Sequence, residues 1–87
     1  MKIKMEFVKR MIAGETFLVP IGETAKKYSG LFALSELAGF IWEILPEAAS
    51  EEEIVDKILA EYEVSHEEAA ADTAEFLAKL REMGILE

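Results

Sequence analysis

Few side chains in this sequence have the type and spacing that catalysis or metal binding requires. His66 is the only histidine, and Glu51–Glu53 form the densest acidic run. A single imidazole lacks the further ligands that a metal site recruits, and neighbouring residues of a helix point in different directions. We interpret both features as parts of helix N-terminal turns, where acidic groups complement the helix dipole.

The sequence also lacks the residues of cysteine-based sites and of glycine-rich phosphate-binding loops. Cysteine is absent, which excludes a disulfide framework, a thiolate metal site and a cysteine nucleophile, and which fits a reducing cytosol. The stretches "AGET" (13–16) and "PIGET" (20–24) do not match the glycine loops that cradle phosphates. Trp42 is expected in the core. We therefore expect a protein that is not an enzyme and has no cofactor or metal.

Length and composition indicate a single domain, residues 1–87. The chain is 52% hydrophobic, which is enough for a modest core. The stretch "MKIKMEFVKR" lacks the apolar segment of a signal peptide, and no uncharged apolar run approaches the ~20 residues that span a bilayer. We expect a cytoplasmic protein without a membrane partner.

Strand-like patterns occupy the first third of the chain. "MEFVKRMI" (5–12) and "TFLVPI" (16–21) are rich in β-compatible residues, and the turn signal between them predicts a hairpin. Pro20 lacks an N–H, which places it at an edge or a strand end. A polar loop (22–30) leads to a third short strand, Gly30–Leu34.

Helical spacing of apolar residues begins after the third strand. The first helix starts at Ser35 and stops near Pro46, which cannot donate a backbone hydrogen bond. Ser50 and Ser65 begin two more helices, and each serine is followed three residues later by a glutamate, the spacing of a capping box. Gly84 is expected just after the end of the last helix.

The predicted order is therefore β-β-β-α-α-α. This order favours an α+β fold in which helices cover one face of a three-stranded antiparallel sheet. The second and third helices are joined by only three residues, "EVS" (63–65). With the hairpin beside it, this connection makes the fold winged-helix-like.

Charge is divided unevenly along the chain. Residues 1–34 carry six basic and three acidic groups, whereas residues 35–87 carry three basic and fifteen acidic ones. The third helix would repel phosphates, so we expect no nucleic acid as a partner. Two alternatives stay open: a winged-helix nucleic-acid-binding domain, and a structural domain that docks on a partner enzyme through its acidic helices.

The third strand offers a different kind of site. If it lies at the edge of the sheet, its unpaired N–H and C=O groups can bind an extended peptide, and the third helix would form the other wall of a groove. The pattern of residues alone slightly favours the alternative, a short edge that is simply solvated.

Two stretches resemble the PqqD-like family, small proteins related to coenzyme PQQ synthesis protein D. "LSELAGFIWEIL" (34–45) is similar to its leucine-asparagine-x-x-glycine-x-x-isoleucine-tryptophan pattern, although Ser35 replaces the common asparagine and Ala38-Gly39 displaces the glycine by one. "EEIVDKILAEYEVSHEEAAADTAEFLAKLREMGILE" (52–87) resembles its closing pattern: an isoleucine-rich helix, a Y-x-V-S turn, an F-L pair and a G-I/L-L finish.

This resemblance implies a RiPP recognition element, a winged-helix-like domain that binds the leader of a ribosomally made precursor peptide. The leader would add as a strand to the third strand and lie against the third helix. The domain would then present the precursor to a modifying enzyme, often a radical SAM enzyme of the SPASM type. Synthesis of PQQ itself does not follow, because many relatives serve other peptides.

The resemblance also implies which residues bind the peptide. They are Gly30, Leu31, Phe32, Ala33 and Leu34 of the third strand, and Asp72, Thr73, Phe76 and Lys79 of the third helix. The choice on the helix depends on which flank of its apolar stripe faces the groove. Phe76 has the alternative of lying wholly in the core.

Overall fold

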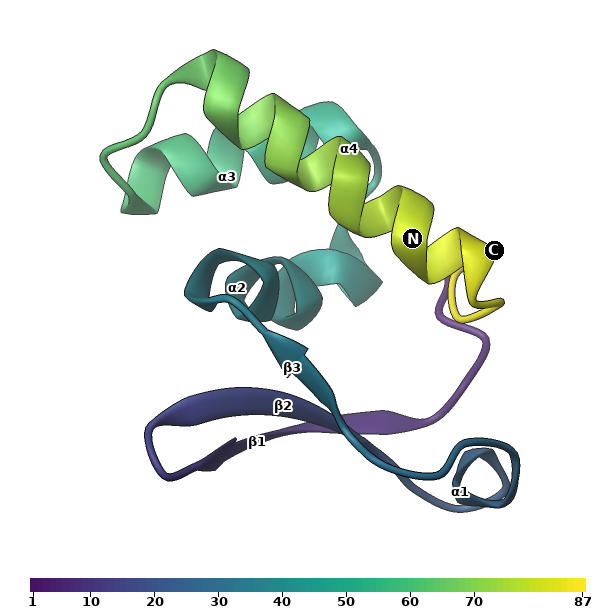
Figure 1. Cartoon of the computed structure of the whole chain (residues 1–87). Coiled ribbons are helices and arrows are strands. Elements are labelled where there is room, and N and C mark those ends of the chain that lie inside the picture. The colour runs from purple at the N-terminus through teal and green to yellow at the C-terminus, as the bar shows by residue number, and fades with distance from the viewer.

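The computed structural model describes residues 1–87 as an antiparallel sheet followed by helices (Figure 1). Its elements are β1 (Phe7–Ile12), β2 (Glu15–Pro20), α1 (Thr24–Lys27), β3 (Phe32–Leu34), α2 (Glu36–Ile44), the 3-10 helix η1 (Leu45–Glu47), α3 (Glu51–Glu61) and α4 (His66–Glu82). The predicted α+β fold, with three strands and then three helices, is confirmed. Two short helical turns, α1 and η1, add to it.

The two added turns were not visible in the sequence pattern. α1 lies in the stretch 22–30 that was expected to be a loop, and η1 directly follows α2 and contains Pro46. The Thr24 hydroxyl accepts a hydrogen bond from the backbone N–H of Glu6 at 2.8 Å, which anchors α1 beside the start of β1. A helix of one turn is too short to show an apolar period, so the sequence gives no signal for it.

The sheet has the order β1-β2-β3, so β1 and β3 are its two edges. All neighbours are antiparallel, and Pro20 lies at the end of β2, as expected. β3 is shorter than the predicted Gly30–Leu34. Gly30 has a φ of +101°, a left-handed conformation that ends the extended segment on its N-terminal side.

Serine side chains begin all three main helices, as the sequence predicts. The hydroxyls of Ser35, Ser50 and Ser65 accept hydrogen bonds of 3.0–3.1 Å from the backbone N–H three residues further on. At the other end of α4, Gly84 has a φ of +76°, and the N–H of Ile85 donates to the carbonyl of Leu80 at 2.8 Å. This is the Schellman arrangement that a glycine in this position favours.

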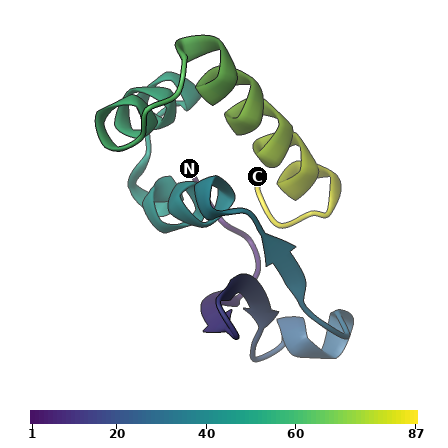
Figure 2. The ribbon, with the colours of Figure 1, turned by 60° about the vertical axis from the view of Figure 1, so that its left-hand side comes forward.

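One apolar cluster holds the sheet and the helices together. α2 packs on β2 and β3 on one side and on α3 and α4 on the other, as Figure 2 shows. Ile54 and Ile58 of α3 and Leu77 of α4 are completely buried. Trp42 is 8% exposed and meets the ring of Phe7 edge-on, with 6.3 Å between the ring centroids. The prediction that Trp42 belongs to the core is confirmed.

None of the helices combines the length and the apolar character that crossing a membrane would require.

The cap of α4 generates a first prediction. We expect Ser65→Ala to lower the free energy of unfolding by about 1 kcal/mol, because the N–H of Glu68 loses its hydrogen-bond acceptor. Ser65→Asp should restore most of the loss, since aspartate is an equally good cap. Urea denaturation followed by circular dichroism measures both. Ser29→Ala, at an exposed serine without a cap role, is the control and should change stability by less than about 0.5 kcal/mol.

Candidate functional site

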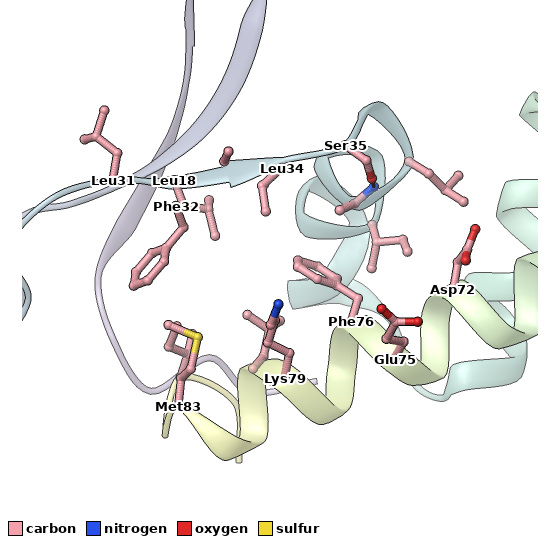
Figure 3. A pocket seen from close by; sticks show the side chains of 16 residues that line it. Leu18, Leu31, Phe32, Leu34, Ser35, Asp72, Glu75, Phe76, Lys79 and Met83 are labelled. Atoms are coloured by element: carbon pink, nitrogen blue, oxygen red, sulfur yellow. Dashed lines mark hydrogen bonds between the residues drawn. The ribbon is translucent and has the colours of Figure 1, made fainter.

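A groove with a volume of about 670 Å³ lies between β3 and α4 (Figure 3). Twelve of the sixteen residues that line it are hydrophobic, so its surface is mainly apolar. β3 and the start of α2 form one wall, α4 forms the other, and Leu18 and Ile41 lie at the bottom. A largely apolar hollow with a few polar groups is the usual form of a binding site.

The backbone of β3 borders this groove with an unpaired edge. β3 pairs with β2 on one side and has no strand on the other. The side chains of Phe32 and Leu34 are half-buried and point toward α4, whereas Ala33 is exposed. Gly30 and Ser35 limit the edge, because the first turns the chain and the second caps α2.

The ladder between β1 and β2 determines where the backbone groups of β2 point. The hairpin closes with the two-residue turn Ala13–Gly14, and at the other end the N–H of Ile21 donates to the carbonyl of Glu6 at 3.0 Å. In an antiparallel pair, hydrogen-bonded and non-hydrogen-bonded positions alternate. Alternate residues of β2 therefore turn their N–H and C=O to β1, and Thr16 and Leu18 turn theirs to β3.

The same alternation identifies the free backbone groups of β3. Phe32 and Leu34 are opposite Leu18 and Thr16, so their N–H and C=O groups point to β2. Successive residues of a strand direct their backbone groups to opposite edges. The N–H and C=O of Ala33, at the centre of β3, therefore point away from β2 along the open edge.

The wall formed by α4 carries one aromatic ring and three charges. Phe76 is half-buried, and its ring projects into the groove (Figure 3). Asp72, Glu75 and Lys79 are exposed beside it, and none of the four ion pairs of the protein includes them. The apolar floor is thus bordered on the helix side by charges that have no partner in the protein.

Tyr28 bridges two lining residues of the groove, Phe32 of β3 and Met83 at the end of α4. Its hydroxyl donates a hydrogen bond to the backbone carbonyl of Met83 at 2.6 Å, which connects the segment before β3 to the end of α4. Its ring lies 5.8 Å from those of Phe7 and Phe32, measured between centroids. Tyr28 therefore fixes the separation of the two walls at this end.

Most of the residues predicted to bind a peptide come together here. Leu31–Leu34, Asp72, Phe76 and Lys79 all line the groove. Gly30 precedes it and does not line it. The structure does not bring Thr73 to the groove either: this residue is 1% exposed, and its hydroxyl has no hydrogen-bond partner.

The position of Thr73 follows from the geometry of α4. Thr73 lies four residues after Ala69 and four before Leu77, on the stripe that faces the core. On the helix Asp72 lies about 100° and Phe76 about 60° from Thr73, both on the same side of this stripe, and so both reach the groove. The flank that faces the groove is the one on which these two residues lie.

Sequence reasoning missed several residues that shape the groove. Glu75 and Met83 line it, and Tyr28 holds one end. An aromatic residue within an otherwise polar loop was the only signal for Tyr28, because its partner lies 55 positions away in the sequence. Glu75 follows Asp72 by one helical turn, and this spacing would have placed it on the same face.

Comparison with known proteins adds an independent line of evidence. The family model described as coenzyme PQQ synthesis protein D (PqqD) matches residues 15–86. A solved structure, "TbiB1 in Complex with the TbiA(beta) Leader Peptide", is similar over the whole chain, with 33% sequence identity and a TM-score of 0.71, and the match covers 100% of this chain and 95% of that one. No curated protein matches.

A second prediction concerns Tyr28. We expect Tyr28→Phe to lower the free energy of unfolding by about 1 kcal/mol, because one hydrogen bond to the carbonyl of Met83 is lost. Amide chemical shifts at Leu31 and Gly84 should change with it. Tyr62→Phe is the matched control, because the Tyr62 ring packs on Phe40 while its hydroxyl has no hydrogen bond within the protein. Equal losses in both variants would contradict a specific role for Tyr28.

Proposed function

The chain belongs to the PqqD family, and we propose that it binds the leader segment of a ribosomally made precursor peptide as an added strand of its sheet. The observation that carries this proposal is the open edge of β3 beside an apolar groove. The similarity to TbiB1, which was solved in complex with a leader peptide, supports it.

The backbone of the leader would pair with β3 in the antiparallel direction, which continues the antiparallel order of the sheet. Ala33 would exchange both of its backbone hydrogen bonds with one residue of the peptide. Such bonds do not depend on the side chains of the peptide, so they provide affinity without selecting a sequence.

Side chains of the leader would provide the selectivity. Every second residue of an added strand faces α4, next to Phe32, Leu34 and Phe76. Burial of one large apolar side chain there would contribute about 1.5–3 kcal/mol before the loss of chain entropy. The leader thus needs apolar residues at alternating positions.

In the same proposal the protein is a peptide chaperone and not an enzyme. It would hold the leader while a separate enzyme modifies the rest of the precursor, and we propose a radical SAM enzyme of the SPASM type, as the family resemblance implies. The leader would occupy one edge of the sheet, which leaves β1 and the outer faces of α3 and α4 accessible to that enzyme. Asp72 and Glu75 would repel phosphates, which disfavours a nucleic acid in the groove.

Nuclear magnetic resonance tests the binding mode directly. We expect a synthetic leader, taken from a short peptide gene beside the gene for this protein, to shift the amides of Leu31–Leu34 and of α4 between Asp72 and Met83. The ¹⁵N-labelled protein is titrated and the shifts are mapped by residue. Shifts confined to α2, or none at millimolar peptide, would contradict strand addition.

A backbone substitution makes the test sharper. Ala33→Pro removes the N–H that points to the open edge but leaves the hydrogen bonds of Phe32 and Leu34 to β2 in place. We expect it to weaken leader binding by about tenfold, the effect of one lost hydrogen bond in a shielded site, while calorimetric unfolding changes little. Ala33→Val keeps the N–H and is the control. Equal affinities of the proline and valine variants would show that Ala33 does not pair with the leader.

A further inference from the structure

The charges on the rim of the groove have a fixed order along its length. Asp72 and Glu75 carry the only negative charges among its lining residues, and Lys79 carries the only positive one. In Figure 3, Asp72 lies toward the Ser35 end of the groove, and Lys79 lies toward the end marked by Phe32 and Met83. The negative and positive groups therefore face different parts of anything that binds along β3.

All three charges are available to a ligand. Their side chains are exposed, and the ion pairs of the protein involve other residues, such as Arg81 of α4 with Glu51 of α3. Lys79 lies beside Phe76 and Leu80, two of the apolar residues of this wall. A charge at the edge of an apolar surface is less screened than one in open water, so an opposite charge on the ligand is favoured there.

The direction of the peptide converts this order into a sequence preference. β3 and α4 run in opposite directions along the groove. A peptide antiparallel to β3 therefore runs in the same direction as α4 and passes Asp72 and Glu75 before it reaches Lys79. Its N-terminal part faces the two carboxylates, and its C-terminal part faces the ammonium group.

The spacing of the charges fits an extended chain. Glu75 and Lys79 are four residues apart on a helix, a rise of about 6 Å, and Asp72 and Lys79 are separated by about 10 Å. Residues on one face of a strand recur about every 6.6 Å. Two groove-facing residues of the peptide, two or four positions apart, can therefore meet the opposite charges.

We propose that the groove selects peptides in which a lysine or arginine precedes an aspartate or glutamate by two or four residues, with the basic residue facing Asp72 and Glu75 and the acidic one facing Lys79. This inference rests on the proposed function, because it names the class of peptide that the same edge accepts. The long stem of the basic residue would lie along the ring of Phe76 while its charged end stays in water.

A selection experiment tests the charge order. A display library of short random linear peptides is panned on three immobilised proteins: the unmodified chain, the exchange variant Glu75→Lys with Lys79→Glu, and the control variant Lys57→Glu with Glu61→Lys. The control exchanges the same charges at the same spacing on exposed positions of α3, outside the groove. Only peptides that Ala33→Pro no longer retains are counted, since these use the edge of β3.

We expect the unmodified chain and the control to enrich the basic-before-acidic order over its reverse by about three- to tenfold at low salt, the ratio that two exposed ion pairs provide. The exchange variant should enrich the reverse order. The preference should shrink in high salt, which screens exposed charges.

The outcomes separate this inference from the proposed function. Equal frequencies of both orders, or the same order on the unmodified chain and the exchange variant, would overturn the charge preference while leaving strand addition intact. Enrichment of the reverse order on the unmodified chain would overturn the antiparallel direction on which the preference depends. If no enriched peptide is sensitive to Ala33→Pro, strand addition itself fails, and the charge preference fails with it.

Discussion

The two-residue turn at Ala13–Gly14 is the constraint on which the open edge of β3 depends. Both residues have positive φ values, +52° and +83°, as a tight hairpin turn of this kind requires. The turn fixes the register of β1 on β2, and this register determines which residues of β2 point their hydrogen-bonding groups to β3. A hairpin loop longer or shorter by one residue would reverse this alternation and leave Ala33 paired to β2.

A second constraint keeps the open edge from being covered. α2 begins directly after β3, at the Ser35 cap, and turns the chain back over the sheet. α4 then packs on α2 and α3. It therefore lies across the groove from β3 and does not cover the open edge of this strand. Tyr28 joins the two walls at one end only. The groove is thus a consequence of one helix acting as a spacer between a strand and another helix.

The sequence was sufficient for the features that local chemistry decides. Ser35, Ser50 and Ser65 marked the helix starts, because a serine hydroxyl is a better partner for free N–H groups than water alone. The order of strands and helices followed from a change of apolar period. β3 was predicted too long, because the left-handed conformation of Gly30 depends on the turn it makes and not on its neighbours in the sequence.

The features that sequence could not decide involve contacts between distant segments. Apolar spacing revealed the buried stripe of α4 but not how the helix is rotated against β3, and Thr73 was therefore assigned to the groove although it faces the core. Tyr28 and Met83 are brought together only by the completed fold. The sequence does not tell whether a polar residue on an apolar stripe, or an aromatic residue in a polar loop, faces the core or a binding site. Only the contacts in the completed fold decide it.

The shortness of β3 is compatible with the proposed peptide binding and would disfavour pairing with the edges of other sheets. A long, flat, unpaired strand would attract the edges of other sheets, whereas only three residues of β3 are extended. Another sheet that approached this edge would meet α4 across the groove, because a sheet is wider than a single chain. In the proposed mode a single extended peptide would lie between the walls and add contacts with Phe76, which would compensate for the few backbone hydrogen bonds. The same geometry would therefore disfavour another sheet while leaving room for the single strand of the proposed mode.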